Sequence, residues 1–263
     1  MPSRCRWFGP RTAPNWRVMR RRFVEVDVFG ERPYGGNPLA VVVDGDGLST
    51  GEMQRFANWT NLSETTFLLP PTDLGADYRV RIFTTTMELP FAGHPTIGSC
   101  HAWLAHGGTP RRADRIVQEC GVGLVAVQPG KDGRLAFAAP ALIRSGPLDD
   151  ATLDEAVAAL GVERDAVVDA AWIDNGPGWL GVLLASADEV LAIRLRDTEL
   201  KIGVIGAHPA GSETAYEVRA FFPADGKTFE DPVTGSLNAS AAQWLVASGR
   251  FTPPYVAAQG TVL

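Results

Sequence analysis

Alternation of apolar and polar side chains marks strands near the start of the chain. The run Phe23–Phe29 (FVEVDVF) alternates, and so does Tyr78–Phe83 (YRVRIF). A period of two residues is typical of a strand with one buried face. The turn-forming residues Gly35–Pro38 follow the first run and lead into the apolar run Leu39–Val43. The pattern predicts two strands joined by a turn, and a further strand at Tyr78–Phe83.

A helix and another strand are predicted between these runs. Ser49 and Glu52 have the spacing of a capping box, which predicts a helix that begins there and ends near Trp59. Asn61–Leu69 is rich in β-branched and apolar residues. We therefore expect a strand in this segment, with Glu64 on it or beside it.

A second helix is predicted further along the chain. Ile97–His106 is rich in small and apolar residues. Thr96 is suited to be its N-cap, and Gly107 is suited to end it. Because most of its side chains are small, such a helix can be buried on all sides.

The strongest internal signal is a repeat of this strand–loop–helix unit. Tyr78–Phe83 is echoed by Tyr216–Phe221 (YEVRAF) at an offset of 138 residues. Further matches follow in the same order: Phe91 with Phe229 at the same offset, Trp103-Leu104 with Trp244-Leu245 at an offset of 141, and the turn 36–38 with 175–177. The repeat predicts an α+β protein with two similar domains, residues 21–128 and 134–263, each a sheet wrapped around a central helix.

Two such halves should enclose a cleft, and small ligands commonly bind in clefts between domains. The loops 93–96 and 231–236 precede the two matching helices. If the halves face each other, both helix N-termini point into the cleft. Their free backbone N–H groups and helix dipoles favour a carboxylate or another anion there.

Composition narrows the class of protein. The chain has 263 residues, of which 45% are hydrophobic and 21% are charged, as is typical of a soluble globular protein. Its three cysteines cannot all pair with one another, which disfavours a disulfide framework and favours a cytoplasmic location. No apolar run approaches the ~20 residues that span a bilayer, so no membrane partner is expected.

Charge is distributed unevenly. The first 22 residues hold seven arginines and no acid, whereas the other 241 hold 17 basic and 30 acidic side chains, a net charge of −13. The net negative charge of residues 23–263 disfavours nucleic acid as a partner. A twin-arginine export signal needs an apolar stretch after the arginines, and Glu25 and Asp27 interrupt it. We expect residues 1–20 to be a disordered leader or the result of a start assigned too early, with Met19 as the alternative start.

Four motifs, in order along the chain, resemble a known family. They are Phe23–Phe29 with Gly36-Asn37-Pro38, Asn61–Thr65 (NLSET), Phe91–Thr96 (FAGHPT) and Glu230–Ser236 (EDPVTGS). From about residue 21 to its end the chain is similar to the PhzF-like proteins of phenazine biosynthesis, whose fold is that of the diaminopimelate epimerases. The resemblance implies a homodimeric isomerase without a cofactor. Such an enzyme shifts a proton, and with it a double bond, on a small amino- or hydroxy-substituted carboxylic acid.

The resemblance also implies the site residues. The glutamate of the Ser-Glu-Thr motif, Glu64, corresponds to the general acid/base, and His94 and Asp231 complete the catalytic set. The implied substrate-binding residues come from the same motifs: Asn37, Gly93, Thr234, Gly235 and Ser236.

These residue types suit a proton transfer. A carboxyl group in a closed, partly apolar pocket has its pKa raised by desolvation, toward the range that proton shuttling needs. His94 could bind the substrate or relay a proton, and Asp231 could orient an amino group. Ser236 and the neighbouring amides could hold the carboxylate. The predicted walls of the pocket are Leu62, Phe67 and Phe91.

Two alternative functions stay open at this point. A two-base epimerase or racemase on the same fold would invert a stereocentre. The epimerase relatives use two cysteines as bases, whereas this chain has His94 and Asp231 in the two loops. Cys100 and Cys120 are expected to be buried core thiols. A ligand-binding protein that kept the cleft and lost its chemistry is the other alternative.

Sequence signals for a cofactor or a metal are weak. Gly121–Ala126 matches a dinucleotide-binding fingerprint as text, but it leads into a strand-like run and Pro129 rather than into a helix. His101 and His106 lack the His-Glu-x-x-His pattern of a zinc site. We therefore expect neither a metal nor an organic cofactor.

The C-terminus departs from the family pattern. Related chains continue past a Gln-Gly segment, here Gln259-Gly260, into a Gly-Arg turn and a last strand, whereas this chain stops at Leu263. The second half is therefore expected to lack its last strand. A partner subunit could cover the strand edge that this leaves unpaired.

Overall fold

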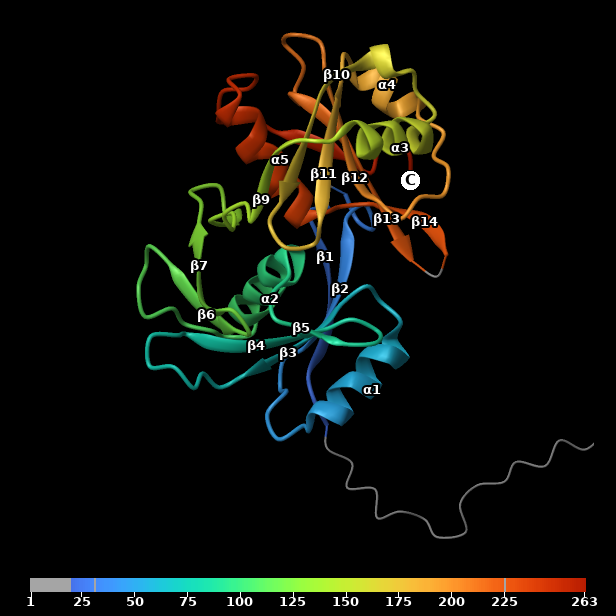
Figure 1. Ribbon diagram of the computed structural model, residues 1–263. Helices are drawn as coiled ribbons and strands as arrows, with labels where there is room; N and C mark the ends of the chain where they lie inside the picture. Colours follow the sequence, from blue (N-terminus) through green and yellow to red (C-terminus); the bar gives the residue numbers. More distant parts are fainter. Residues whose placement is uncertain (1–19, 31, 225) are drawn as a thin grey trace, which may run out of the picture.

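The computed structural model describes residues 20–30, 32–224 and 226–263. The expectations for the leader therefore lie, apart from Arg20, outside the described residues. Within them the chain forms two mixed sheets with a helix packed against each, so the α+β prediction is confirmed (Figure 1). Figure 1 shows the two halves one above the other, with α2 and α5 near their junction.

The first half contains an eight-stranded sheet, with the order β1-β2-β3-β4-β6-β7-β8 and β5 paired with β4. Its central helix, α2, lies against β1, β2 and β3. The elements are β1 (Phe23–Val28), β2 (Asn37–Val42), α1 (Thr50–Thr60), β3 (Thr65–Leu69), β4 (Tyr78–Phe83), β5 (Glu88–Leu89), α2 (Gly93–Ala105), β6 (Ile116–Cys120), β7 (Gly123–Pro129) and β8 (Leu135–Phe137).

The second half contains a seven-stranded sheet, with the order β14-β13-β12-β11-β10-β9 and β15 paired with β13. Its central helix is α5. The elements are β9 (Arg144–Pro147), α3 (Asp150–Leu160), the 3-10 helix η1 (Arg164–Ala166), β10 (Val167–Asp174), β11 (Trp179–Leu184), α4 (Ala187–Ala192), β12 (Lys201–Ala207), β13 (Tyr216–Ala224), β14 (Lys227–Asp231), α5 (Gly235–Ala247) and β15 (Ala257–Gln259).

Strand pairing confirms the predicted repeat. In the first half β4 pairs antiparallel with β5 and parallel with β6. In the second half β13 pairs antiparallel with β14 and parallel with β15. The repeat extends to the register, because the parallel pairing starts at the matching tyrosine in each half. Tyr78 pairs with Gln118 on β6, and Tyr216 pairs with Ala257 on β15. Tyr78 and Tyr216 are the residues that open the two matching sequence runs.

The two central helices match in length and in the way they end. Each is 13 residues long, and each is followed by a glycine in the left-handed region, Gly107 (φ +93°) and Gly249 (φ +71°). The helices begin at Gly93 and Gly235. Their ends are thus offset by 142 residues, one more than the offset of 141 between the Trp-Leu pairs.

The predicted junction at 128–134 is instead a hairpin turn inside the first sheet. β7 and β8 pair antiparallel, and the N–H of Gly130 donates to Arg134 O (2.7 Å). Gly133 has φ +83°, a conformation that favours glycine in a tight turn. The chain passes from one sheet to the other later, within 138–143. A Pro-Gly-rich stretch is typical of both linkers and hairpin turns, which explains the error.

The start of α2 also differs from the prediction. Thr96 is not the N-cap, because the helix already begins at Gly93, with Ala92 as N-cap. Pro95 is tolerated in the first turn, where its missing N–H would have had no partner within the helix. Thr96 Oγ1 donates to Ala92 O (2.9 Å). His94 consequently lies inside the first turn of α2 rather than in a loop before it.

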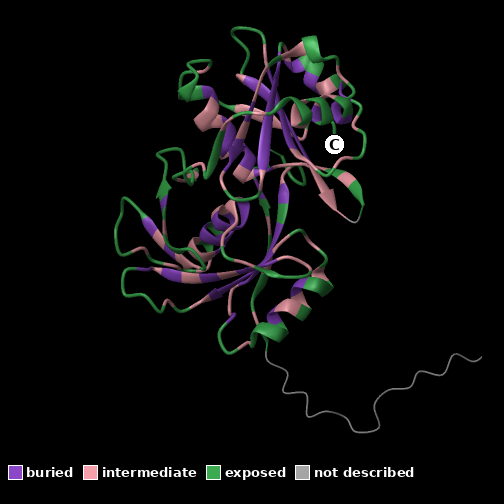
Figure 2. Ribbon diagram, viewed as in Figure 1, coloured by how far each residue is buried: buried purple, intermediate pink, exposed green. Residues whose placement is uncertain are grey.

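The core of each half is the apolar face between the sheet and its central helix. In the first half Leu39 on β2 and Cys100 on α2 are fully buried, and in the second half Val218 on β13 and Leu237 on α5 are as well. Figure 2 shows the buried residues concentrated on the strands and on the inward faces of the helices. Among the described residues, no helix is long and apolar enough to cross a membrane.

Candidate active site

The three predicted catalytic residues lie at the ends of three different elements. Glu64 directly precedes β3, His94 is the second residue of α2, and Asp231 is the last residue of β14. A hydrogen bond from Ser99 Oγ to Thr66 Oγ1 (2.9 Å) ties α2 to β3. Glu64 Oε2 thereby lies 3.5 Å from His94 Nε2. The structure brings the predicted acid/base residue and the predicted histidine into contact.

Glu64 has the electrostatic character of an acid/base group. Burial, together with the smaller effect of the nearby charge of Asp231, raises its pKa from the ordinary 4.5 to about 7. Burial likewise raises the pKa of Asp231, against hydrogen bonds from Thr234 and Val233 that lower it. Two acids that share a buried region cannot both ionise at low cost. Glu64 can therefore hold or release a proton near neutral pH.

His94 is held as a neutral imidazole. Its side chain is only 7% exposed, and this burial lowers its pKa from 6.5 to about 4. Glu64 Oε2 and His94 Nε2 are both buried, and neither makes a hydrogen bond among the described residues. Leaving a buried polar atom without a partner costs about 1–3 kcal/mol. Because such atoms are rare in folded proteins, two of them facing each other indicate groups kept for a ligand.

The N-termini of the two central helices lack the side-chain caps that the other described α-helices have. The side chains of Ser49, Asp149 and Ser186 accept hydrogen bonds from the first turns of α1, α3 and α4. The N-cap residues of α2 and α5, Ala92 and Thr234, make no such bond. The first-turn N–H groups of α2 and α5 therefore stay available to an anion.

These two helix ends meet. A Cβ added to Gly93 would lie 3.4 Å from the Cα of Gly235, and a Cβ added to Gly235 would lie 3.5 Å from the backbone N of His94. Glycine at both positions lets the two backbones approach closely. The predicted substrate-binding residues Gly93 and Gly235 are thus brought together at the junction.

The remaining predicted binding residues surround the start of α5. Asn37, on β2 of the first half, donates from Nδ2 to Val233 O (3.2 Å). Thr234 Oγ1 donates to Asp231 Oδ2 (2.7 Å). Ser236 Oγ accepts from Trp179 Nε1 (2.9 Å). Since the indole can only donate, this contact leaves the hydroxyl proton of Ser236 free to donate elsewhere.

Sequence reasoning missed several residues of this region. Asn175 Nδ2 donates to Ser236 O (2.9 Å), and Trp179 holds the Ser236 hydroxyl. The match between the turns 36–38 and 175–177 was the available signal for Asn175, and no pattern pointed to Trp179. Gln259 was noted only as part of a Gln-Gly pair, although its side chain bonds to the 231–234 loop.

One predicted wall of the pocket is wrong. Phe67 is fully buried in a separate cluster with Met53 of α1 and Phe83 of β4. Alternation along β3 points Phe67 away from α2, whereas Thr66 points toward it. Phe91 does lie near the helix ends, since it packs edge to face with Phe137 (5.6 Å), whose ring lies 3.4 Å from a Cβ added to Gly93.

The two cysteines in the described part of the chain belong to the core of the first half. Cys100 is fully buried in the core of the first half, as predicted, and burial raises its pKa to about 12. Cys120, at the end of β6, is half-buried and packs against the same core. A thiol whose pKa is raised carries little of the reactive thiolate at neutral pH.

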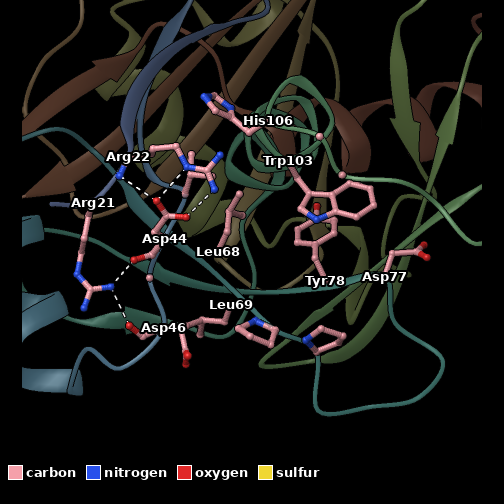
Figure 3. A pocket seen from close by; sticks show the side chains of 16 residues that line it. Arg21, Arg22, Asp44, Asp46, Leu68, Leu69, Asp77, Tyr78, Trp103 and His106 are labelled. Carbon is pink, nitrogen blue, oxygen red and sulfur yellow. Dashed lines mark hydrogen bonds and ion pairs between the residues drawn. The ribbon is translucent and has the colours of Figure 1, made fainter. Parts of the chain in front are cut away.

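A separate pocket of about 450 Å³ lies at the opposite end of α2 (Figure 3). Trp103 and His106, from the end of that helix, line it together with Arg21, Arg22 and Tyr78. None of the predicted site residues lines it. Among the described residues no group of three or more His, Cys, Asp or Glu side chains is placed to hold a metal ion.

Comparison with known proteins gives a consistent result. A family model described as phenazine biosynthesis-like protein matches residues 26–260. Antisense-enhancing sequence 1 of Schizosaccharomyces pombe is 38% identical over 259 residues, covering 92% of this chain and 86% of its own. Trans-2,3-dihydro-3-hydroxyanthranilate isomerase of Pseudomonas fluorescens is 34% identical over 250 residues, covering 90% and 85%.

Solved structures share the fold. The Bacillus anthracis phenazine biosynthesis protein of the PhzF family superposes with a TM-score of 0.78 at 23% identity, covering 93% of this chain and 87% of its own. An Enterococcus faecalis protein of the same family gives a TM-score of 0.72 at 26% identity, covering 92% and 88%.

Proposed function

The chain belongs to the phenazine biosynthesis-like protein family and is an isomerase, and from this premise we propose that it shifts a proton with Glu64 as the acid/base. The substrate class we propose is a small amino- or hydroxy-substituted carboxylic acid. The names of the Pseudomonas relatives specify a dihydro-3-hydroxyanthranilate. The proposed reaction uses neither a metal nor an organic cofactor.

The observation that carries this proposal is the state of Glu64. With a pKa of about 7, both its ionised and its protonated form are populated at neutral pH. The ionised form can take a proton from one carbon of the substrate, and the protonated form can return it to another. A group whose pKa lies near the working pH is the most effective at both steps. Neutral His94, 3.5 Å away, can relay the proton or bind the substrate.

The substrate carboxylate would be held by the helix ends. Gly93 and Gly235 bring the uncapped first turns of α2 and α5 together. Their N–H groups favour an anion, and the hydroxyl of Ser236, whose oxygen already accepts from Trp179, is free to donate to it. Asp231, whose charge acts on Glu64, suits an amino or hydroxyl substituent of the substrate. These contacts would place the reacting carbons against Glu64.

Hydrogen exchange tests the proposal. Trans-2,3-dihydro-3-hydroxyanthranilate and a panel of small unsaturated amino acids are incubated in D₂O and followed by NMR. The wild type is expected to introduce deuterium at carbon, and Glu64→Gln is expected to lose this activity by about 10²–10⁴-fold. Glu25→Gln, an exposed residue of β1, is the matched control and should match the wild type. Equal exchange by wild type and Glu64→Gln would remove Glu64 from the mechanism.

The same experiment separates the two alternative functions. An epimerase would exchange a proton at a stereocentre and racemise the product, which chiral chromatography detects. A ligand-binding protein would bind the same compounds equally well with or without Glu64→Gln and turn over none of them.

We also propose that the protein acts in the cytoplasm as a homodimer. The free thiols Cys100 and Cys120 support a reducing compartment. Light scattering after size-exclusion chromatography tests the dimer, and a mass near 28.2 kDa would contradict it.

A further inference from the structure

The side chain of Gln259, at the end of β15, uses all of its hydrogen-bonding capacity on the loop that carries Asp231. Its Oε1 accepts from the N–H of Thr234 (3.0 Å) and from Asn238 Nδ2 (2.7 Å). Its Nε2 donates to Asp231 O (2.9 Å) and to Thr234 Oγ1 (3.0 Å). A primary amide has two donor hydrogens and two acceptor lone pairs, so all four are satisfied here.

These hydrogen bonds determine which atom donates in the hydrogen bond between Thr234 and Asp231. The Gln259 amide nitrogen can only donate, so Thr234 Oγ1 must accept from it. The hydroxyl proton of Thr234 is then directed to Asp231 Oδ2, at 2.7 Å. The amide of Gln259 thus acts through Thr234 on the carboxylate of Asp231.

The next residue brings β15 against the same loop. Gly260 has φ +85°, and a Cβ added to it would lie 2.8 Å from Pro232 O. No other residue type fits this approach without displacing the loop. The Gln259-Gly260 pair therefore holds the 231–234 segment both by hydrogen bonds and by close backbone contact.

We propose that Gln259 is a positioning residue for the proton transfer described above: it orients the Thr234 hydroxyl and thereby holds the Asp231 carboxylate in the site beside Glu64. The inference rests on the proposed function for its catalytic consequence. Its structural part, the orientation of Asp231, can be measured without any substrate.

The hydrogen bond from Thr234 to Asp231 can be followed through the pKa of Asp231. Burial raises the pKa of Asp231, and the hydrogen bond from Thr234 opposes that rise. The titratable groups nearby are Glu64, whose pKa Asp231 raises, and His94, which contacts Glu64. Glu230, the chain neighbour, is paired with Arg219 (2.6 Å). Loss of the Thr234 bond should therefore raise the pKa of Asp231.

The first experiment is a carboxyl ¹³C NMR titration of the full chain labelled at Asp and Glu, with Asp231→Asn and Glu64→Gln used for assignment. In Gln259→Leu the titration of Asp231 is expected to move to higher pH. Thr234→Val, which keeps Gln259, is expected to cause the same change, and Thr234→Ser, which keeps the hydroxyl, is expected to restore the wild-type curve. An unchanged Asp231 curve in both Gln259→Leu and Thr234→Val would overturn the proposal.

The second experiment measures turnover at several pH values. Gln259→Leu is expected to lower kcat on the order of 10²-fold, with a smaller change in KM and a shifted acid limb of the pH profile. Gln54→Leu is the matched control. It removes a half-buried glutamine on α1 that makes one side-chain bond, to Thr84 O, and should leave kcat and the profile unchanged. A loss of kcat with an unshifted profile would mean that Gln259 is merely structural.

The two experiments together distinguish a failure of the proposed function from a failure of the positioning role. If the wild type turns over none of the compounds while the Asp231 titration shifts as expected, the proposed function fails and the positioning role stands. If the wild type is active and Gln259→Leu retains its kcat and its profile, the positioning role fails alone.

Discussion

α2 and α5 are equivalent helices of the two halves, and their N-termini meet at Gly93 and Gly235, but the second residue is His94 in α2 and Ser236 in α5. His94 makes no hydrogen bond from Nε2 among the described residues and contacts the acid/base candidate. Ser236 is held by Trp179 and Asn175. The two halves thus have similar uncapped helix ends, whose second residues differ in their hydrogen bonding. The roles we propose for them differ accordingly: proton exchange for His94 and hydrogen-bond donation for Ser236.

A glutamine on a neighbouring strand binds at each of the two central helices, and the two glutamines make different hydrogen bonds. Gln118, on β6, is fully buried; it accepts from Tyr78 Oη (2.9 Å) and donates to Thr96 Oγ1 inside α2 (3.1 Å). Gln259, on the equivalent strand, binds the loop before α5. Gln118 therefore anchors the helix itself, whereas Gln259 anchors the acid that precedes the helix. The two glutamines lie on equivalent strands but at different register positions, since Gln118 pairs with Tyr78 and Gln259 pairs with Val218.

The largest expected effect tests the two helix ends directly. His94→Gln should lower kcat by about 10²–10⁴-fold, since it removes a group in contact with Glu64. Ser236→Ala should cost about tenfold, mainly in KM, since it would remove the hydrogen bond that we propose between Ser236 and the substrate. Steady-state kinetics with the substrate found by hydrogen exchange measures both. A larger loss from Ser236→Ala than from His94→Gln would reverse the roles assigned to the two ends.

The second expected effect concerns stability. Arg219 of β13 pairs with Glu230 of β14 in the interior, with side chains 6% and 11% exposed, and also donates to Val190 O and Ile193 O. The equivalent pair, Arg81 with Glu88, is more exposed, with side chains 16% and 39% exposed.

Arg219→Met should therefore lower the free energy of unfolding by about 3–5 kcal/mol, because it leaves a buried charge unpaired. Arg81→Met should lower it by less than about 1 kcal/mol. Urea denaturation followed by circular dichroism measures both variants. Equal losses would show that the two pairs are equally buried in solution.

The third expected effect is the pH dependence of stability. The pKa of Glu64 is about 7 in the folded protein and 4.5 ordinarily, so the folded state binds this proton more tightly. Relative to Glu64→Gln, the wild type should therefore lose stability as pH rises from 4.5 through 7. The variant should become more stable than the wild type by on the order of 2–3 kcal/mol at pH 8, with little difference at pH 4.

Urea denaturation at pH 4, 6 and 8 measures this difference. His94, whose pKa is lowered to about 4, contributes stability that is lost as pH falls below 6.5. That contribution is common to both proteins and cancels in the comparison. A difference that does not grow with pH would contradict a buried, protonated Glu64.

The smallest expected effect separates the two glutamines. Gln118→Leu leaves Tyr78 Oη and Thr96 Oγ1 without their partner in the core, which should cost about 1–3 kcal/mol of unfolding free energy. It should leave the titration of Asp231 unchanged, in contrast to Gln259→Leu. Denaturation and the carboxyl NMR titration check the two statements. An Asp231 shift in Gln118→Leu would show that the two anchors are coupled across the junction.

Local patterns predicted much of the fold. The capping box of Ser49 and Glu52 is present, and β4 has the bounds that its alternation predicts. These features depend on contacts between near neighbours, so the sequence alone specifies them. Where two local structures share one composition, the prediction was wrong: the Pro-Gly stretch at 128–134 is a hairpin turn, and Pro95 lies inside a helix.

Local order along the chain is enough to predict the two halves, their matching strand–loop–helix units and the residue types near their junction, because periodicity, helix caps and repeats can be recognised from neighbouring residues. Three contacts become visible only in the folded chain: Glu64 lies 3.5 Å from His94, Gly93 meets Gly235, and Gln259 binds the Asp231 loop 28 residues before it. These contacts join distant segments. Their distances, and the burial that raises the pKa of Glu64, follow from how the two sheets pack.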